Sequence, residues 1–82
     1  MSVRLYVVDS KVIIPCVENK KIAVYEANNE VLTISQTLYL ENWVSSDKLL
    51  VDNDSIMLFD YTGTIKHAYM LKEKTYVQLD II

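Results

Sequence analysis

The residues that could carry out catalysis are few and lie far apart along this chain. His67 is the single histidine and Cys16 the single cysteine. A cysteine and a histidine form an activated nucleophile only when the fold brings them within hydrogen-bond reach. His67 falls inside an expected strand, and Cys16 lies in an apolar segment where cysteine commonly packs as a small hydrophobic residue. We therefore expect no enzyme, and a cryptic enzyme built on this pair is the alternative.

Three acidic residues suggest calcium chemistry, since Asp52, Asp54 and Asp60 lie close together in the sequence. Calcium loops of this kind also need a glycine at the sharp turn and a distal glutamate, and both are missing at this spacing. A hairpin turn explains Asp52 and Asp54, because aspartate bonds its own backbone in turns. Gly63 is the single glycine, so a glycine-rich loop that cradles phosphate is excluded. We expect no metal and no cofactor.

Composition narrows the class of protein further. The chain has 82 residues, which predicts a single β-rich domain over 1–82. The net charge of −3 argues against nucleic-acid binding, which usually needs a basic face. No apolar run is long enough to cross a membrane. The start of the chain lacks the pattern of a signal peptide, so we expect a cytoplasmic protein. The apolar content of 51% is high for so short a chain and indicates self-association.

Alternation of side chains with period two dominates the sequence and predicts antiparallel strands. Asp9 and Ser10 supply turn chemistry between the first two strands, and Gly63 suits a left-handed position in a later hairpin. Pro15 lacks the N–H that a sheet ladder needs, so the second strand must end nearby, lie at an edge or carry a bulge. The expected strands cover 3–8, 12–14, 22–25, 31–34, 49–51, 56–59, 64–71 and 75–82.

Two parts of the chain resemble each other. Residues 17–26 align without gaps with 51–60. We interpret this match as part of an internal repeat of 12–44 and 48–82; the alternative is convergence, because two hairpins with short turns look alike. We therefore expect a mainly β fold, a small antiparallel β-barrel or sandwich built from two similar hairpin units. The alternative is an α+β fold with one short helix near 36–45, because Tyr39 and Trp43 have the spacing of neighbours on one helix face.

Two groups of residues could form a binding surface. The first is aromatic, and tyrosine and tryptophan are enriched at binding hot spots. The second is acidic and would complement a basic partner. We expect a small non-enzymatic protein that binds, and inhibits, a larger protein partner; a homo-oligomer that encloses or sequesters a small ligand is the alternative. The candidate residues are Tyr39, Trp43, Asp52, Asp54, Tyr61 and Tyr69.

Overall fold

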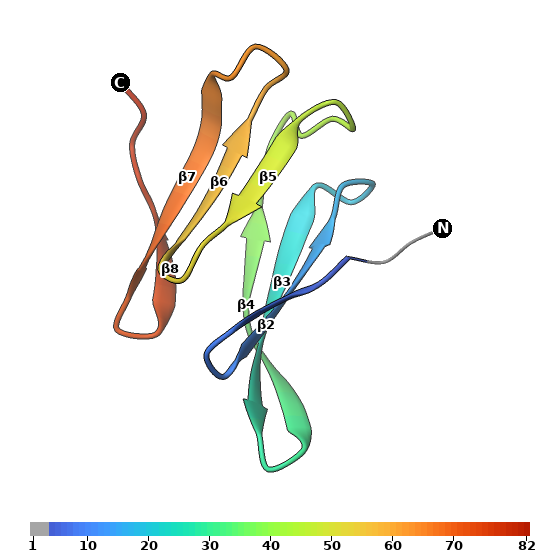
Figure 1. The fold of residues 1–82 in the computed structure, drawn as a ribbon, viewed down its shortest axis with the longest axis vertical. Helices are drawn as coiled ribbons and strands as arrows, with labels where there is room; N and C mark the ends of the chain where they lie inside the picture. Colours follow the sequence, from blue (N-terminus) through green and yellow to red (C-terminus); the bar gives the residue numbers. More distant parts are fainter. Residues whose placement is uncertain (1–3) are drawn as a thin grey trace. The chain divides into compact units, whose positions relative to one another are not determined.

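The computed structural model describes residues 4–82, which divide into two compact units. Unit 1 ends at Trp43 and unit 2 begins at Val44. Each unit contains one four-stranded antiparallel sheet, and the residues described contain no helix (Figure 1). This confirms the mainly β, antiparallel prediction. Neither sheet closes on itself into a barrel, because each has two edge strands. The sandwich stays a prediction.

Unit 1 is a meander in which each strand pairs with the next along the chain. Its strands are β1 (Tyr6–Val8), β2 (Lys11–Cys16), β3 (Lys21–Asn28) and β4 (Val31–Tyr39), in that order across the sheet. The β3–β4 hairpin extends two residues past the end of the β2 pairing, because β2 pairs only as far as Glu26 and β4 pairs as far as Asn28 (Figure 1). β1 and β4 form the two edges of this sheet.

Pro15 is tolerated in β2 for a reason that the pairing makes clear. Pro15 lies opposite Ile22 of β3, while the pairing of β2 with β1 stops at Ile13. In an antiparallel sheet a central strand turns alternate backbone groups to its two neighbours. Ile13 bonds to β1, so the nitrogen of Pro15 also faces the β1 side, where β1 has already ended. The expectation that the second strand ends nearby is confirmed, since β2 stops at Cys16.

Two of the hairpins are closed by loops of two residues with left-handed backbone. In the β3–β4 loop Asn29 has a φ of 49° and Glu30 a φ of 68°. Positive φ at both positions belongs to the type I′ turn, whose twist matches that of the flanking strands. Asparagine adopts this region readily, but glutamate does so at a steric cost. The loop thus gains hairpin geometry at the expense of local strain.

The alternative of a short helix near 36–45 is wrong. Residues up to Tyr39 belong to β4, and a turn follows in which Asn42 has a φ of 62°. Leu40 donates its N–H to the carbonyl of Lys20 at 2.8 Å, so the chain stays in sheet-like pairing immediately after β4. Tyr39 ends a strand and Trp43 follows a turn, so their i, i+4 spacing does not place them on one face of a helix.

Unit 2 is a second meander. Its strands are β5 (Lys48–Val51), β6 (Ser55–Phe59), β7 (Ile65–Lys72) and β8 (Thr75–Gln78), again in chain order across the sheet. Gly63 has a φ of 90° in the β6–β7 hairpin, the left-handed conformation predicted for it. The β7–β8 loop is a two-residue turn in which Glu73 and Lys74 have φ values of 49° and 71°.

Both sheets carry a β-bulge at matching points. In unit 1 the register shifts after Val24 of β3, and in unit 2 it shifts after Leu58 of β6. These two residues occupy the same column of the alignment between 17–26 and 51–60. The fourth strands differ, since β1 precedes the shared meander in unit 1 and β8 follows it in unit 2. The internal repeat of 12–44 and 48–82 stays a prediction.

Candidate interaction surface

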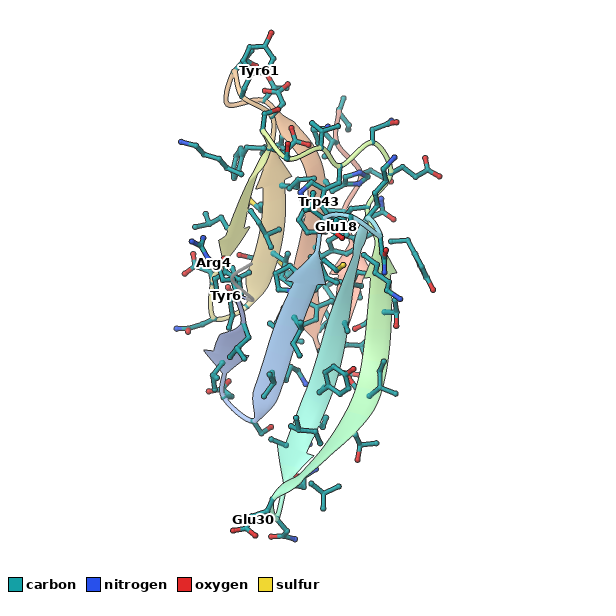
Figure 2. All side chains as sticks on the ribbon, turned by 90° about the vertical axis from the view of Figure 1, so that its right-hand side faces the viewer. Arg4, Tyr6, Glu18, Glu30, Trp43 and Tyr61 are labelled. Carbon is teal, nitrogen blue, oxygen red and sulfur yellow. The ribbon has the colours of Figure 1, made fainter. Side chains whose placement is uncertain are left out.

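The predicted binding residues of unit 1 have opposite environments. Tyr39, at the end of β4, is 69% exposed, whereas Trp43 is only 6% exposed. Figure 2 shows Trp43 near the same end of unit 1 as Glu18 in the β2–β3 turn, with Glu30 at the other end. Trp43 therefore belongs to the buried side chains, and of these two only Tyr39 can contact a partner directly.

The predicted residues of unit 2 lie at opposite ends of its sheet. Asp52 and Asp54 are exposed in the β5–β6 turn, at one end of β6. Tyr61 is 82% exposed and lies in the β6–β7 turn, at the other end of β6; Figure 2 shows its side chain at the tip of this turn. Tyr69 in β7 is 4% exposed, and its burial raises the pKa of the phenol. The fold thus separates the acidic turn from the exposed tyrosine and does not join them in one patch.

One face of the unit 1 sheet is buried and defines the core face. Residues paired across antiparallel strands point to the same side of a sheet, so the register assigns every side chain to a face. Ile13 of β2 pairs with Val24 of β3, and both side chains are 0% exposed. The buried members of the core face are Val8, Lys11, Ile13, Ile22, Val24 and Leu38.

The opposite face of this sheet, here called the open face, is also apolar but is not buried. An antiparallel sheet with one face in the core usually carries polar residues on the other. Lys21 is the only charged residue among the strand positions of this face, and all of these positions are half-buried or exposed. The open face consists of Val7, Val12, Ile14, Cys16, Lys21, Ala23, Tyr25, Ala27, Leu32, Ile34, Thr37 and Tyr39.

A continuous row of apolar side chains crosses the open face from edge to edge. Val7 pairs with Val12, Val12 with Tyr25, and Tyr25 with Ile34, so all four strands contribute one member. The two ends of the row are the most open, with Val7 68% and Ile34 55% exposed. Cross-strand aromatic and β-branched pairs stabilise a sheet. Here they also leave an apolar strip accessible to another molecule.

A buried cation marks the core face of the same sheet. The Lys11 side chain is 5% exposed and its ammonium contacts the Glu26 carboxylate, which is 23% exposed. The two residues are register partners across β2 and β3, and Ser10 donates a further hydrogen bond to Glu26 at 3.0 Å. A buried ammonium needs such a partner because its desolvation is costly. This pair is therefore structural and lies on the face opposite to the apolar row.

In unit 2 the bulge directs a lysine onto a carboxylate. Lys66 is the extra residue of β7 at the register shift, and its Nζ lies 2.7 Å from Oδ2 of Asp47. The same oxygen accepts the N–H of Val44 at 2.9 Å. The hydrogen bond from Lys66 is the main reason that the pKa of Asp47 is lowered from 3.8. The pair thus fixes the turn that leads into β5.

Asp60 organises the β6–β7 hairpin in a similar way. Its Oδ1 accepts hydrogen bonds from the hydroxyl and N–H of Thr62, at 2.5 and 2.8 Å, and from the N–H of Thr64 at 3.0 Å. These bonds, the Thr62 hydroxyl first, lower the pKa of Asp60 from 3.8. Asp60 was read from the sequence as a weak candidate for calcium, and the structure gives its carboxylate a role in the turn.

Acid should destabilise unit 2 through these two carboxylates. Both pKa values are lower in the folded chain than the ordinary value of 3.8. The stability that Asp47 and Asp60 contribute is therefore complete above the unfolded pKa and is lost as the pH falls through the folded pKa. We expect the melting temperature to be level at neutral pH and to fall below about pH 5. Thermal melts by circular dichroism between pH 7 and pH 2 measure this, and the Asp47→Asn/Asp60→Asn variant should show a flatter decline. An equal decline in both proteins would contradict this assignment.

Cys16 and His67 are the two remaining residues whose side chains could take part in catalysis. Cys16 is half-buried at the end of β2 on the open face, and His67 is half-buried in β7 opposite Leu58. Within residues 4–82, no three histidine, cysteine, aspartate or glutamate side chains are grouped so as to hold a metal ion. The same residues include no helix with the length and apolarity needed to span a membrane.

Comparison with protein-family models, with curated proteins and with solved structures gives no match. The open face was not found by sequence analysis, although a signal existed. Val7 and Val8 are apolar on both sides of β1, and Val12, Ile13 and Ile14 run without interruption in β2. Such runs indicate a strand that is apolar on both faces.

Proposed function

We propose that this chain is a non-enzymatic binding module that docks on a larger protein partner through the open face of unit 1. The observation that supports this most strongly is the apolar row of Val7, Val12, Tyr25 and Ile34. Contiguous exposed apolar surface on a small protein commonly marks an interaction site. The rigid sheet beneath the row holds these side chains in place, so little ordering entropy is lost on binding.

The composition of the open face fits the centre of a protein interface. Such centres are depleted in charged residues and enriched in aromatic ones. The open face carries Tyr25 and Tyr39 and a single charge, Lys21. Removing a large apolar side chain from water contributes about 1.5–3 kcal/mol. Several such side chains in one row therefore contribute a favourable term that offsets the cost of association.

The expected partner is still a larger protein, but we place its docking surface on the open face of unit 1 and not on the acidic and aromatic residues chosen from the sequence. Tyr39 belongs to the open face, whereas Asp52, Asp54 and Tyr61 lie in the turns of unit 2. The tips of turns offer less apolar area than a sheet face, so we give Asp52 and Asp54 a secondary role in steering the partner through charge. Trp43 is buried, so we give it no contact with the partner.

Replacing Ile14 by lysine tests the proposal. Ile14 lies half-buried in β2, near the centre of the open face, and it pairs with Ala23. A charge there opposes an apolar partner surface, and we expect the affinity for the partner to fall about 100-fold or more. The measurement is quantitative co-purification of the partner with the tagged full chain from its source cells, followed by titration of the identified partner against each variant by calorimetry.

The matched control is Tyr61→Lys, which adds the same charge on the exposed β6–β7 turn. It should retain the partner within about threefold, as should Asp52→Asn. A reversed ranking, with Tyr61→Lys abolishing binding and Ile14→Lys leaving it intact, would place the docking surface on unit 2. Failure of the wild-type chain to bind any protein reproducibly would contradict a binding module altogether. Circular dichroism of each variant separates lost contact from lost fold.

A further inference from the structure

The β4 edge of unit 1 lacks the protection that edge strands usually carry. Natural sheets guard their edges with charged side chains, proline, bulges or very short strands. β4 has nine residues, Val31–Tyr39, and none of them is charged or proline. Its first half is the most open part, with Val31 58%, Leu32 55% and Ile34 55% exposed. The bulge at Ser35 lies beyond this half.

The backbone of this half offers hydrogen-bonding groups to a further strand. Asn28 and Val31 flank the two-residue turn, and residues in that position exchange both backbone hydrogen bonds. Pairs then alternate, so Val31 and Thr33 bond to β3 while the N–H and C=O of Leu32 and Ile34 point away from it. The hydrogen bond from the Ala27 N–H to Ser10, on the β2 side, follows the same alternation.

We propose that the β4 edge pairs antiparallel with the β4 edge of a second copy of this chain. Two antiparallel edges complement each other in backbone hydrogen bonds. A twofold axis pairs residues that lie at equal distances on either side of it, so a charge close to the axis would meet the same charge of the second copy. β4 avoids this repulsion because it has no charge. Its polar side chains are Thr33, Ser35, Gln36 and Thr37, all neutral groups that both donate and accept hydrogen bonds.

A strand from a different protein fits this edge less well. A charged edge can select a strand of opposite charge from another protein. β4 carries no charge and so has no such means of selection. The other edges of the two sheets are poorer templates for pairing. β1 has three residues, β8 has four and follows Lys74, and β5 has four and begins with Lys48. The pairing is therefore assigned to β4.

Pairing at β4 also extends the apolar row. Ile34 ends the row at this edge, and its neighbour across the new contact would come from the second copy. This self-association does not rest on the proposed docking of a larger partner, because it depends on the edge rather than on the open face.

The pairing is tested by measuring the native mass of three full-length proteins: the wild-type chain and two lysine variants. The wild-type chain should be a dimer by sedimentation equilibrium at micromolar concentration. Ile34→Lys puts a charge on each of the two paired edges, and its dimer dissociation constant should rise at least about tenfold. Val7→Lys is the matched control, because Val7 lies in the same apolar row at the opposite edge. Its dissociation constant should stay within about twofold of wild type.

A second measurement keeps the test independent of how well the variants fold. Amide hydrogen exchange of the wild-type chain should show protection of the Leu32 and Ile34 amides that grows with protein concentration. The Val7 amide, which points away from β2 by the same alternation, should exchange rapidly at every concentration. A wild-type monomer, equal weakening by both lysine variants, or masses that grow without limit would overturn the closed β4 pair.

Discussion

Replacing Trp43 by alanine should strongly destabilise the folded chain rather than remove a binding contact. Trp43 is 6% exposed, and truncating a buried tryptophan costs about 3–5 kcal/mol. A chain of 82 residues has a total stability of roughly 4–12 kcal/mol at the usual value per residue. We therefore expect a large fall in the urea midpoint, followed by circular dichroism because Trp43 is the only tryptophan and its fluorescence is lost.

Trp43→Phe separates the two roles of this side chain. Phenylalanine keeps most of the buried apolar volume, so the loss of stability should be about 1–2 kcal/mol. Partner binding of the folded Trp43→Phe protein should equal that of wild type. If Trp43→Ala kept wild-type stability but lost the partner, Trp43 would be a contact residue and its burial would have no structural consequence.

Replacing Glu26 by alanine should destabilise unit 1 by about 3 kcal/mol. The loss leaves the ammonium of Lys11, whose side chain is 5% exposed, without its main carboxylate partner. Breaking a buried ion pair from one side costs about 3–5 kcal/mol. The lower end of this range applies here because the Glu26 side chain is 23% exposed, so water reaches the pair. Urea denaturation at neutral pH measures the change.

The informative control removes both charges at once. In Lys11→Met/Glu26→Leu the buried ammonium is gone, and apolar replacement of a whole buried pair is often neutral. We expect the double variant to recover most of the stability that Glu26→Ala loses. A double variant less stable than Glu26→Ala would mean that the pair holds β2 and β3 in register in a way that apolar contact does not replace.

The strands were predictable because their signals are local. Period-two alternation, the turn residues Asp9 and Ser10, and the left-handed Gly63 act over a few positions of the chain. Each is seen again in the two meanders. The missing N–H of Pro15 predicted an edge, a bulge or a nearby end of the strand, and the last of these three is what β2 shows.

The candidate site was not predictable in the same way, because a face depends on pairing between distant residues. Tyr25 and Ile34 share the open face only through a register that includes the bulge after Val24. A shift of one residue would move every side chain of a strand to the other face. Trp43 and Tyr69 have the residue types of a binding surface, yet their exposure is decided by packing that the sequence does not display.

Methyl NMR of the full chain in complex with its partner tests the docking surface most directly. The central claim is that the partner covers the open face of unit 1. It predicts that the largest shift changes fall on the methyl groups of Val7, Val12 and Ile14, while those of buried Ile56 and Leu58 in unit 2 stay in place. Large changes confined to unit 2, with the three open-face residues unmoved, would contradict it.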